Sequence, residues 1–246
     1  MPESLFTYNW YSNFLNNLKE NDYKVCDYDN WSGYDRCAIL RHDIDNDIEK
    51  AVKIAEIEND NEVRSTYFVL LTSDFYNVFS LNNINRIKRI ISLGHDIGLH
   101  FDEVRYKEIS TIDEMIRKIE DEADILSTMI GHQIRVVSMH RPSEKVLEAD
   151  ITMPNLINSY GNVFFNEFKY LSDSRKRWRE PVDKIICGGE YDRLHILIHP
   201  FWYNDSEINI HDSIYEFVNN GNLCRYKGMN DNITRLSEIM TEDEVL

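Results

Sequence analysis

Residues 37–45 read Cys37-Ala38-Ile39-Leu40-Arg41-His42-Asp43-Ile44-Asp45, an apolar run that ends in charged and polar side chains. The apolar part has the length of a buried β-strand. A helix is expected next, because Asp and Asn residues that can cap it precede apolar residues on one helical face (Ile48, Ala51, Val52, Ala55). A buried strand followed by an amphipathic helix is the repeating unit of parallel α/β proteins.

The same alternation continues along the chain. Apolar runs predict further strands at 66–71, 96–100, 134–139, 156–159, 168–171, 185–187 and 195–198. Helical spacing predicts a helix at about 3–21, before the first strand, and others near 84–93, 111–129 and 210–217. We therefore expect one domain over residues 1–246, a right-handed β/α barrel preceded by an N-terminal helix.

Composition narrows the range of partners. The chain has 246 residues, 42% of them hydrophobic, and a formal net charge of -16 that disfavours binding to nucleic acid. Two segments are basic despite the acidic net charge. One contains Arg86, Lys88 and Arg89, the other contains Arg175, Lys176, Arg177 and Arg179, and a local anion site is compatible with either. Four scattered cysteines, the lack of a secretory leader and the lack of a transmembrane segment predict a cytoplasmic protein.

Polar residues follow five of the apolar runs. They are Arg41 to Asp45 after Leu40, His100 after Leu99, His140 and Arg141 after Met139, Ser172 and Asp173 after Leu171, and His199 after Ile198. The carboxyl ends of parallel strands meet on one face of a barrel, where active sites of such barrels lie. The sequence therefore predicts that these residues share one site.

A divalent metal is expected at this site. Asp43 and Asp45 are two residues apart, so an extended chain carries both carboxylates on one side, where they repel each other unless a cation or a proton lies between them. With His100 and His140, Asp45 completes a three-ligand set with an open position, typical of catalytic zinc. Nickel, cobalt, manganese and iron also suit these donors.

His199 has the chemistry of a general acid near neutral pH. Taken singly, each of these residues also fits a structural role, as a helix cap or a packed histidine, so the prediction rests on their coincidence. The other histidines are expected to be structural (His42, His95, His132, His195, His211).

Four segments resemble motifs of the polysaccharide deacetylases with NodB homology, the carbohydrate esterase 4-like family. They are Leu40 to Asp45, Gly94 to His100, His140-Arg141-Pro142 and Leu197-Ile198-His199-Pro200. Ser172-Asp173-Ser174 and Trp178-Arg179 resemble the WbmS-like branch, which is associated with bacterial surface polysaccharides. The likeness covers roughly residues 37–203.

This resemblance implies a distorted barrel of about seven strands that hydrolyses an acetyl group from a sugar or glycan intermediate. It further implies that Asp43 is the catalytic base, Arg141 the partner that orients the base, and His199 the acid. Asp45 and His100 are implied as metal ligands. Asp173, Trp178 and Trp202 are expected to contact the substrate.

The chain departs from the family at Val104, which occupies the position of a family histidine four residues after His100. We therefore expect His140 to be the third ligand, with Asp102 or Glu103 as substitutes. Because Ile44 separates the two aspartates, their roles are open to exchange. Two other functions remain open from sequence: hydrolysis of another non-peptide C–N bond, and a non-catalytic barrel that binds a glycan or a partner protein.

Overall fold

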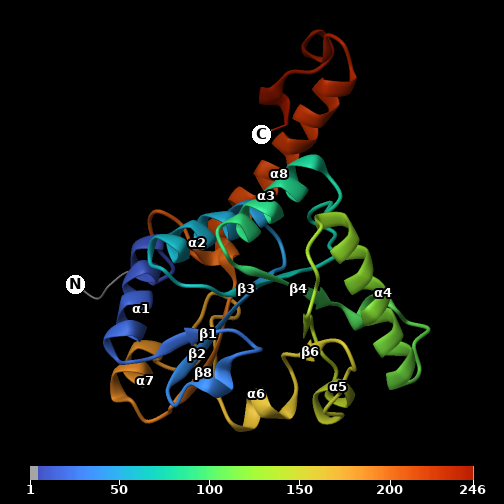
Figure 1. Cartoon of the computed structure of the whole chain (residues 1–246). Coiled ribbons are helices and arrows are strands. Elements are labelled where there is room, and N and C mark those ends of the chain that lie inside the picture. Colours follow the sequence, from blue (N-terminus) through green and yellow to red (C-terminus); the bar gives the residue numbers. More distant parts are fainter. Residues whose placement is uncertain (1–4, 246) are drawn as a thin grey trace. The chain divides into compact units, whose positions relative to one another are not determined.

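The fold is built on one parallel sheet in a computed structural model that describes residues 5–245. Seven strands follow one another in the order β6-β5-β4-β3-β2-β8-β7, and β1 pairs separately with β2. Their bounds are β1 Lys24–Cys26, β2 Cys37–Ile44, β3 Thr66–Val69, β4 Asp96–Phe101, β5 Val136–Met139, β6 Ile157–Asn158, β7 Lys169–Ser172 and β8 Arg193–Ile198. The sheet curls into an incomplete barrel with β6 and β7 at its edges (Figure 1).

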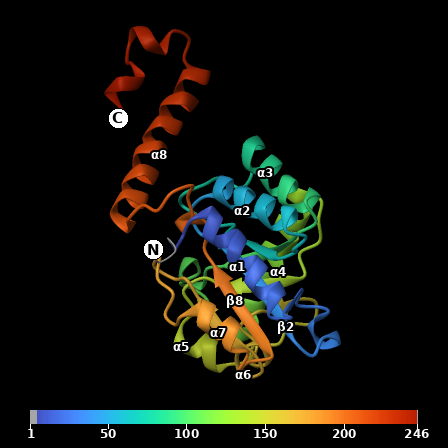
Figure 2. The ribbon, with the colours of Figure 1, turned by 90° about the vertical axis from the view of Figure 1, so that its left-hand side faces the viewer.

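Helices follow most of the strands of the sheet. Those that belong to the same compact unit as the sheet are α1 Tyr8–Glu20, α2 Ile48–Asp60, α3 Leu81–Ser92, α4 Ile112–Ile130, α5 Glu144–Glu148, α6 Asn162–Asn166 and α7 Val182–Gly188, and α8 Ile210–Asn232 belongs to a second unit. Helix α1 packs against α2 and α7 (Figure 2). The predicted α/β class and the distorted barrel of about seven strands are confirmed. The first residues of the helix expected at 3–21 lie outside the described residues.

Strand β2 separates two different environments. Ala38, Leu40 and Ile44 belong to the large apolar core that the sheet forms with its helices, whereas Ile39 belongs to a smaller cluster inside the barrel. Side chains of a strand alternate between its two faces, so residues 39, 41 and 43 share the inner face. The alternation places Arg41 and Asp43 inside the barrel.

Two local expectations differ from the structure. Residues 185–187, expected as a strand, lie in helix α7, because Val182 and Ile186 are buried one turn apart and Gly189 ends the helix with a left-handed φ of 64°. Strand β1 was not predicted, since it has only three residues and just Cys26 is buried. By contrast, the helix expected near 111–129 forms as α4, and Thr111 and Glu114 make a capping box at its start.

The chain contacts divide into two compact units, the first ending at Asp205 and the second beginning at Ser206. In the second unit, the side chain of Asn209 accepts from the backbone N–H of Asp212 and caps α8. The hydroxyl of Tyr226 donates to the carbonyl of Met240, 3.0 Å away. The expectation of a single domain over residues 1–246 stays a prediction.

Candidate active site

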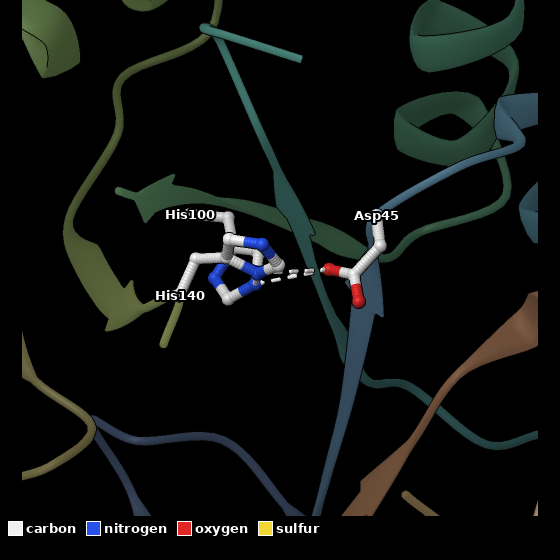
Figure 3. Close-up of side chains that lie close together, drawn as sticks. All are labelled: Asp45, His100 and His140. Carbon is white, nitrogen blue, oxygen red and sulfur yellow. Dashed lines mark hydrogen bonds and ion pairs between the residues drawn. The ribbon is translucent and has the colours of Figure 1, made fainter. Parts of the chain in front are cut away.

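Three potential metal ligands converge at the carboxyl edge of the sheet. Asp45 follows β2, His100 belongs to β4 and His140 follows β5. Each offers one donor atom, and these atoms lie within 4.8 Å of one another. Asp45 Oδ1 is 3.2 Å from His100 Nε2 and 3.3 Å from His140 Nδ1 (Figure 3). Among residues 5–245 this is the one group of side chains with such an arrangement.

The donor set fits a divalent transition metal. Asp45 Oδ1 is buried and makes no hydrogen bond with another described residue, although both histidine rings lie close to it. The nearest groups to this oxygen are the ring nitrogens of His100 and His140, and a cation held between the carboxylate and the two rings would satisfy all three donors. One carboxylate and two imidazoles are also donors that zinc accepts while keeping a coordination position open.

Burial raises the pKa of Asp45, but the adjacent rings of His100 and His140 lower it more, so the net pKa lies well below its usual range. Asp45 is therefore ionised at neutral pH. His100 and His140 also contact each other, with Nδ1 of His140 3.0 Å from Nε2 of His100. The three side chains are held against one another as one cluster.

Asp43 lies beside this cluster and is held by Arg41. The Nε and Nη2 atoms of Arg41 donate to the two carboxylate oxygens of Asp43 over 3.2 and 2.7 Å. Arg41 is fully buried and also donates to the hydroxyls of Ser138 and Ser159. Burial raises the pKa of Asp43, but the charge and hydrogen bonds of Arg41 together with the nearby His100 and His199 lower it more, so the carboxylate stays ionised.

His199 completes the site. It follows β8, which is the neighbour of β2 on the side opposite β3. Its Nδ1 lies 2.6 Å from Oδ1 of Asp173, and its Nε2 lies 3.8 Å from Oδ2 of Asp45. The Asp173 carboxylate also accepts from the backbone N–H of His199. Burial lowers the pKa of His199, but Asp173 raises it more, to about 9. The imidazole is therefore protonated at neutral pH.

The structure gives Asp173 and Arg141 roles other than those expected from the sequence. Asp173, expected to contact the substrate, is fully buried and holds His199 instead. Arg141, expected to orient Asp43, pairs with Asp102, and Arg41 occupies the position beside Asp43. The arginine that contacts Asp43 therefore comes from the same strand, β2, and not from the segment after β5.

The substitute ligands suggested for the third position are engaged elsewhere. Asp102 pairs with Arg141, and Glu103 accepts from the backbone N–H of Ser143. Val104 is half exposed, so it does not occupy the cluster. The geometry therefore favours His140 as the third ligand.

The two expected tryptophan contacts lie in packed surroundings. Trp178 packs against the rings of Trp10 and Phe14, with centroids 6.0 and 6.3 Å away. Trp202 follows His199 in the 3₁₀ helix Pro200–Trp202 and packs edge-on against Phe201. Both side chains are partly buried against the core, and a substrate contact for either stays a prediction.

Arg41 is the residue of the candidate site that was not predicted from the sequence. Its signal was present, because Arg41, Asp43 and Asp45 recur every second residue and a strand therefore carries them on one face. A guanidinium in a buried strand also needs an anion close by, since an unpaired buried charge is very costly. The nearest anion on its own face is Asp43.

No family model and no curated protein sequence matches the chain. Solved structures do resemble it. One is the peptidoglycan deacetylase PdaC from Bacillus subtilis, 16% identical, covering 76% of this chain and 85% of that chain with a TM-score of 0.45. A family 4 acetyl xylan esterase from Clostridium thermocellum is 16% identical, covering 66% and 73% with a TM-score of 0.40.

A third resemblance is to BA3943 from Bacillus anthracis, described as a CE4 family pseudoenzyme, 15% identical, covering 76% of this chain and 64% of that chain with a TM-score of 0.44. The structural neighbours thus include polysaccharide deacetylases, whereas the WbmS-like branch stays a prediction. At these identities and TM-scores, function has to be judged from the geometry of the site. In residues 5–245, no helix combines the length and apolar character required to cross a membrane.

Proposed function

We propose that this protein is a metal-dependent hydrolase that removes an acetyl group from a sugar or a glycan intermediate. The observation that carries the proposal is the convergence of Asp45, His100 and His140 from three separate strand ends, with donor atoms within 4.8 Å. The resemblance of the sequence motifs to polysaccharide deacetylases supplies the substrate class. Zinc is the metal we expect.

The three ligands would hold the ion, and the remaining side chains would move the protons. A bound divalent ion lowers the pKa of water and polarises a carbonyl group. Asp43 accepts the proton of the attacking water, and Arg41 keeps this carboxylate ionised and fixed in orientation. His199 carries a proton on Nε2 and gives it to the leaving amine or alcohol, while Asp173 holds the ring through Nδ1. The products are acetate and the deacetylated sugar.

Acetate release tests the proposal. Protein reconstituted with one equivalent of zinc is incubated with a panel of N-acetylated and O-acetylated sugars, and acetate is measured by an enzyme-coupled assay. We expect release that is lost after chelation and restored by zinc. Release of ammonia or another amine without acetate would replace this function with hydrolysis of a different C–N bond.

The non-catalytic alternative makes a separate prediction. A barrel that only binds glycans would bind the acetylated sugars without releasing acetate, at any metal load. Stoichiometric zinc with unchanged sugars across the whole panel, recovered intact after long incubation, would favour that alternative.

A further inference from the structure

The loop between β7 and α7 carries a concentration of positive charge beside the candidate active site. It begins at Asp173, directly after β7, and contains Arg175, Arg177 and Arg179, which we call the arginine loop. The loop leaves the carboxyl end of its strand, and β7 pairs in parallel with β8, which carries His199 at its own carboxyl end. The arginine loop therefore lies on the same edge of the sheet as the proposed site.

Asp173 ties the loop directly to the site. Its carboxylate holds the ring of His199, and its carbonyl accepts from the backbone N–H of Arg177, 3.2 Å away. The hydroxyl of Ser174 is 2.6 Å from the hydroxyl of Ser172, which fixes the start of the turn on the end of the strand. The arginine loop is therefore anchored to the proposed acid through its first residue, Asp173.

The charge of these arginines is not balanced by neighbouring carboxylates. Many arginines elsewhere in the same unit pair with an Asp or Glu, as in Arg36–Asp192, Arg86–Glu49, Arg89–Glu56 and Arg193–Glu167. Within residues 5–245, no carboxylate is in ion-pair contact with Arg175, Arg177 or Arg179, and all three are exposed. In a chain with 43 acidic and 27 basic residues, an unpaired group of three is unexpected.

The backbone of the loop is also unusual. Arg175 has a φ of 60° and the next residue, Lys176, has a φ of 55°, so two successive residues other than glycine adopt the left-handed region. Each such residue costs of order 1 kcal/mol or more and persists where the surrounding structure requires it. The turn is tight, so that the three arginines leave the backbone from a short segment that directly follows Asp173.

We propose that the arginine loop binds phosphate groups of the substrate, so that the substrate is an acetylated sugar linked to phosphate or diphosphate. This inference rests on the proposed function and narrows its substrate class. Guanidinium groups bind phosphate oxygens through two parallel hydrogen bonds, and several of them match the charge of a diphosphate better than that of a single carboxylate.

The chemistry of such a sugar requires an anion site near the group that reacts. In a 2-acetamido sugar the acetamido group and the anomeric phosphate are on neighbouring ring carbons. An anion site must then lie close to the reacting carbonyl, and the arginine loop begins at Asp173, the residue that holds His199. The diphosphate would come from a sugar nucleotide or from a lipid-linked sugar.

Binding of sugars that carry no acetyl group tests the inference without any turnover. The probes are glucose, glucose 1-phosphate, uridine diphosphate glucose and farnesyl diphosphate-linked glucose, measured by isothermal titration calorimetry on the zinc-loaded full chain. We expect at least one diphosphate probe to bind at least about 10-fold more tightly than glucose, from charge-assisted contacts. Which of the two diphosphate probes binds more tightly identifies the source of the diphosphate.

The matched variants are Arg175→Gln/Arg177→Gln/Arg179→Gln and the control Arg86→Gln/Arg89→Gln/Arg117→Gln, which removes the same charge from α3 and α4. The loop variant should weaken binding of the diphosphate probe by about 10- to 100-fold and leave glucose unchanged, since each lost charge-assisted contact weakens binding several-fold. The control should bind like the wild type. Equal weakening by both variants, no effect of the loop variant, or no preference for phosphate would overturn the inference.

These outcomes are independent of the proposed deacetylation. If uncharged acetyl-sugars release acetate but the arginine loop does not affect phosphate binding, the loop inference fails and the proposed function stands. If the loop binds diphosphates but no acetylated sugar is hydrolysed, the proposed function fails instead.

Discussion

Two clusters of acids and histidines lie on the two faces of the sheet near strand β2, and they differ in how their hydrogen bonds are satisfied. On one side of the sheet, Asp45 lies with His100 and His140, and its Oδ1 is buried without a hydrogen bond from a described residue. On the other side, Glu58 of α2 lies with His42 and His95 in the core. The two clusters have the same kinds of side chain.

Both oxygens of Glu58 are fully used. Oε1 accepts from the hydroxyl of Tyr11 and lies 2.8 Å from Nε2 of His42, while Oε2 accepts from the hydroxyls of Ser65 and Tyr67. Protein groups already satisfy this carboxylate, so neither of its oxygens remains for a ligand. The comparison teaches that the state of the hydrogen bonds, more than the type of residue, separates a ligand-ready cluster from a structural one.

The largest expected effect is on turnover and follows from a substitution of Asp43. This residue is next to His42 in sequence but lies on the other face of β2. Asp43→Asn should reduce kcat by about 10³-fold or more, since the proposed base no longer accepts a proton. The side-chain oxygen of asparagine can still accept one hydrogen bond from Arg41, so zinc content should remain near one per chain. Steady-state rates of acetate release, with zinc measured on the same sample, check this. A variant with unchanged kcat would remove Asp43 from the chemistry.

The second effect is on stability and belongs to the structural cluster. Burial raises the pKa of Glu58, but His42 and His95 lower it more, to about 2. Glu58→Gln should therefore cost about 3 kcal/mol at pH 7, at about 1.4 kcal/mol for each pH unit between the folded and ordinary pKa. Urea unfolding measures this change, and zinc content serves as the control.

The sign of the pH dependence follows from the lowered pKa of Glu58. The stability that its ionised form supplies is present above the ordinary pKa of about 4.5 and is lost as the pH falls towards about 2. The difference between wild type and Glu58→Gln should accordingly shrink on acidification. A difference that stays constant down to pH 2 would contradict an ionised Glu58.

A third prediction separates Arg41 from Arg141. Arg41→Lys keeps the charge but loses the two parallel hydrogen bonds to Asp43, so kcat should fall by about 10- to 100-fold with little change in KM. Arg141→Lys is the matched control, because its partly exposed guanidinium pairs with Asp102. Parallel measurements of kcat and KM on both variants decide between the two arginines, and a larger loss in Arg141→Lys would reverse the assignment.

The smallest effect concerns Glu122, a third buried carboxylate. The hydroxyl of Tyr106 donates to Oε1 of Glu122, whereas Oε2 has no described partner. Burial raises the pKa of Glu122 to about 7. A raised pKa supplies stability at low pH that is lost as the pH rises through about 7, so between pH 6 and 8 the wild type should lose about 1 kcal/mol more than Glu122→Gln. Urea unfolding at the two pH values tests this, and parallel curves would contradict a neutral Glu122.

Much of the fold could be predicted because the strands are nearly continuous apolar runs and their helices carry clear caps. Residues 136–139 and 194–198 are examples, since both are buried and rich in β-branched or aliphatic residues. Short elements were not predicted correctly, because a segment of three to seven residues shows too little periodicity to be recognised. Helix α7 was mistaken for a strand because Ile185-Ile186-Cys187 is apolar over three residues, and the decisive burial of Val182 depends on tertiary packing.

In the site, placement at strand ends was sufficient to group Asp43, Asp45, His100, His140 and His199. It was not sufficient to assign partners, because the sequence does not say which buried charges meet. The pairs Arg41–Asp43 and Asp173–His199 depend on the order of neighbouring strands and on which side chain fills each space. That information exists only in the folded chain.

Zinc stoichiometry in matched variants tests the central claim most directly. After equilibration with zinc and removal of free metal, elemental analysis should give one zinc per wild-type chain and one per Glu58→Gln chain, but almost none for Asp45→Asn. Such a result would assign metal binding to the cluster with the unsatisfied carboxylate oxygen. A wild-type chain without zinc, or equal zinc in Asp45→Asn, would contradict the metal centre and with it the proposed hydrolysis.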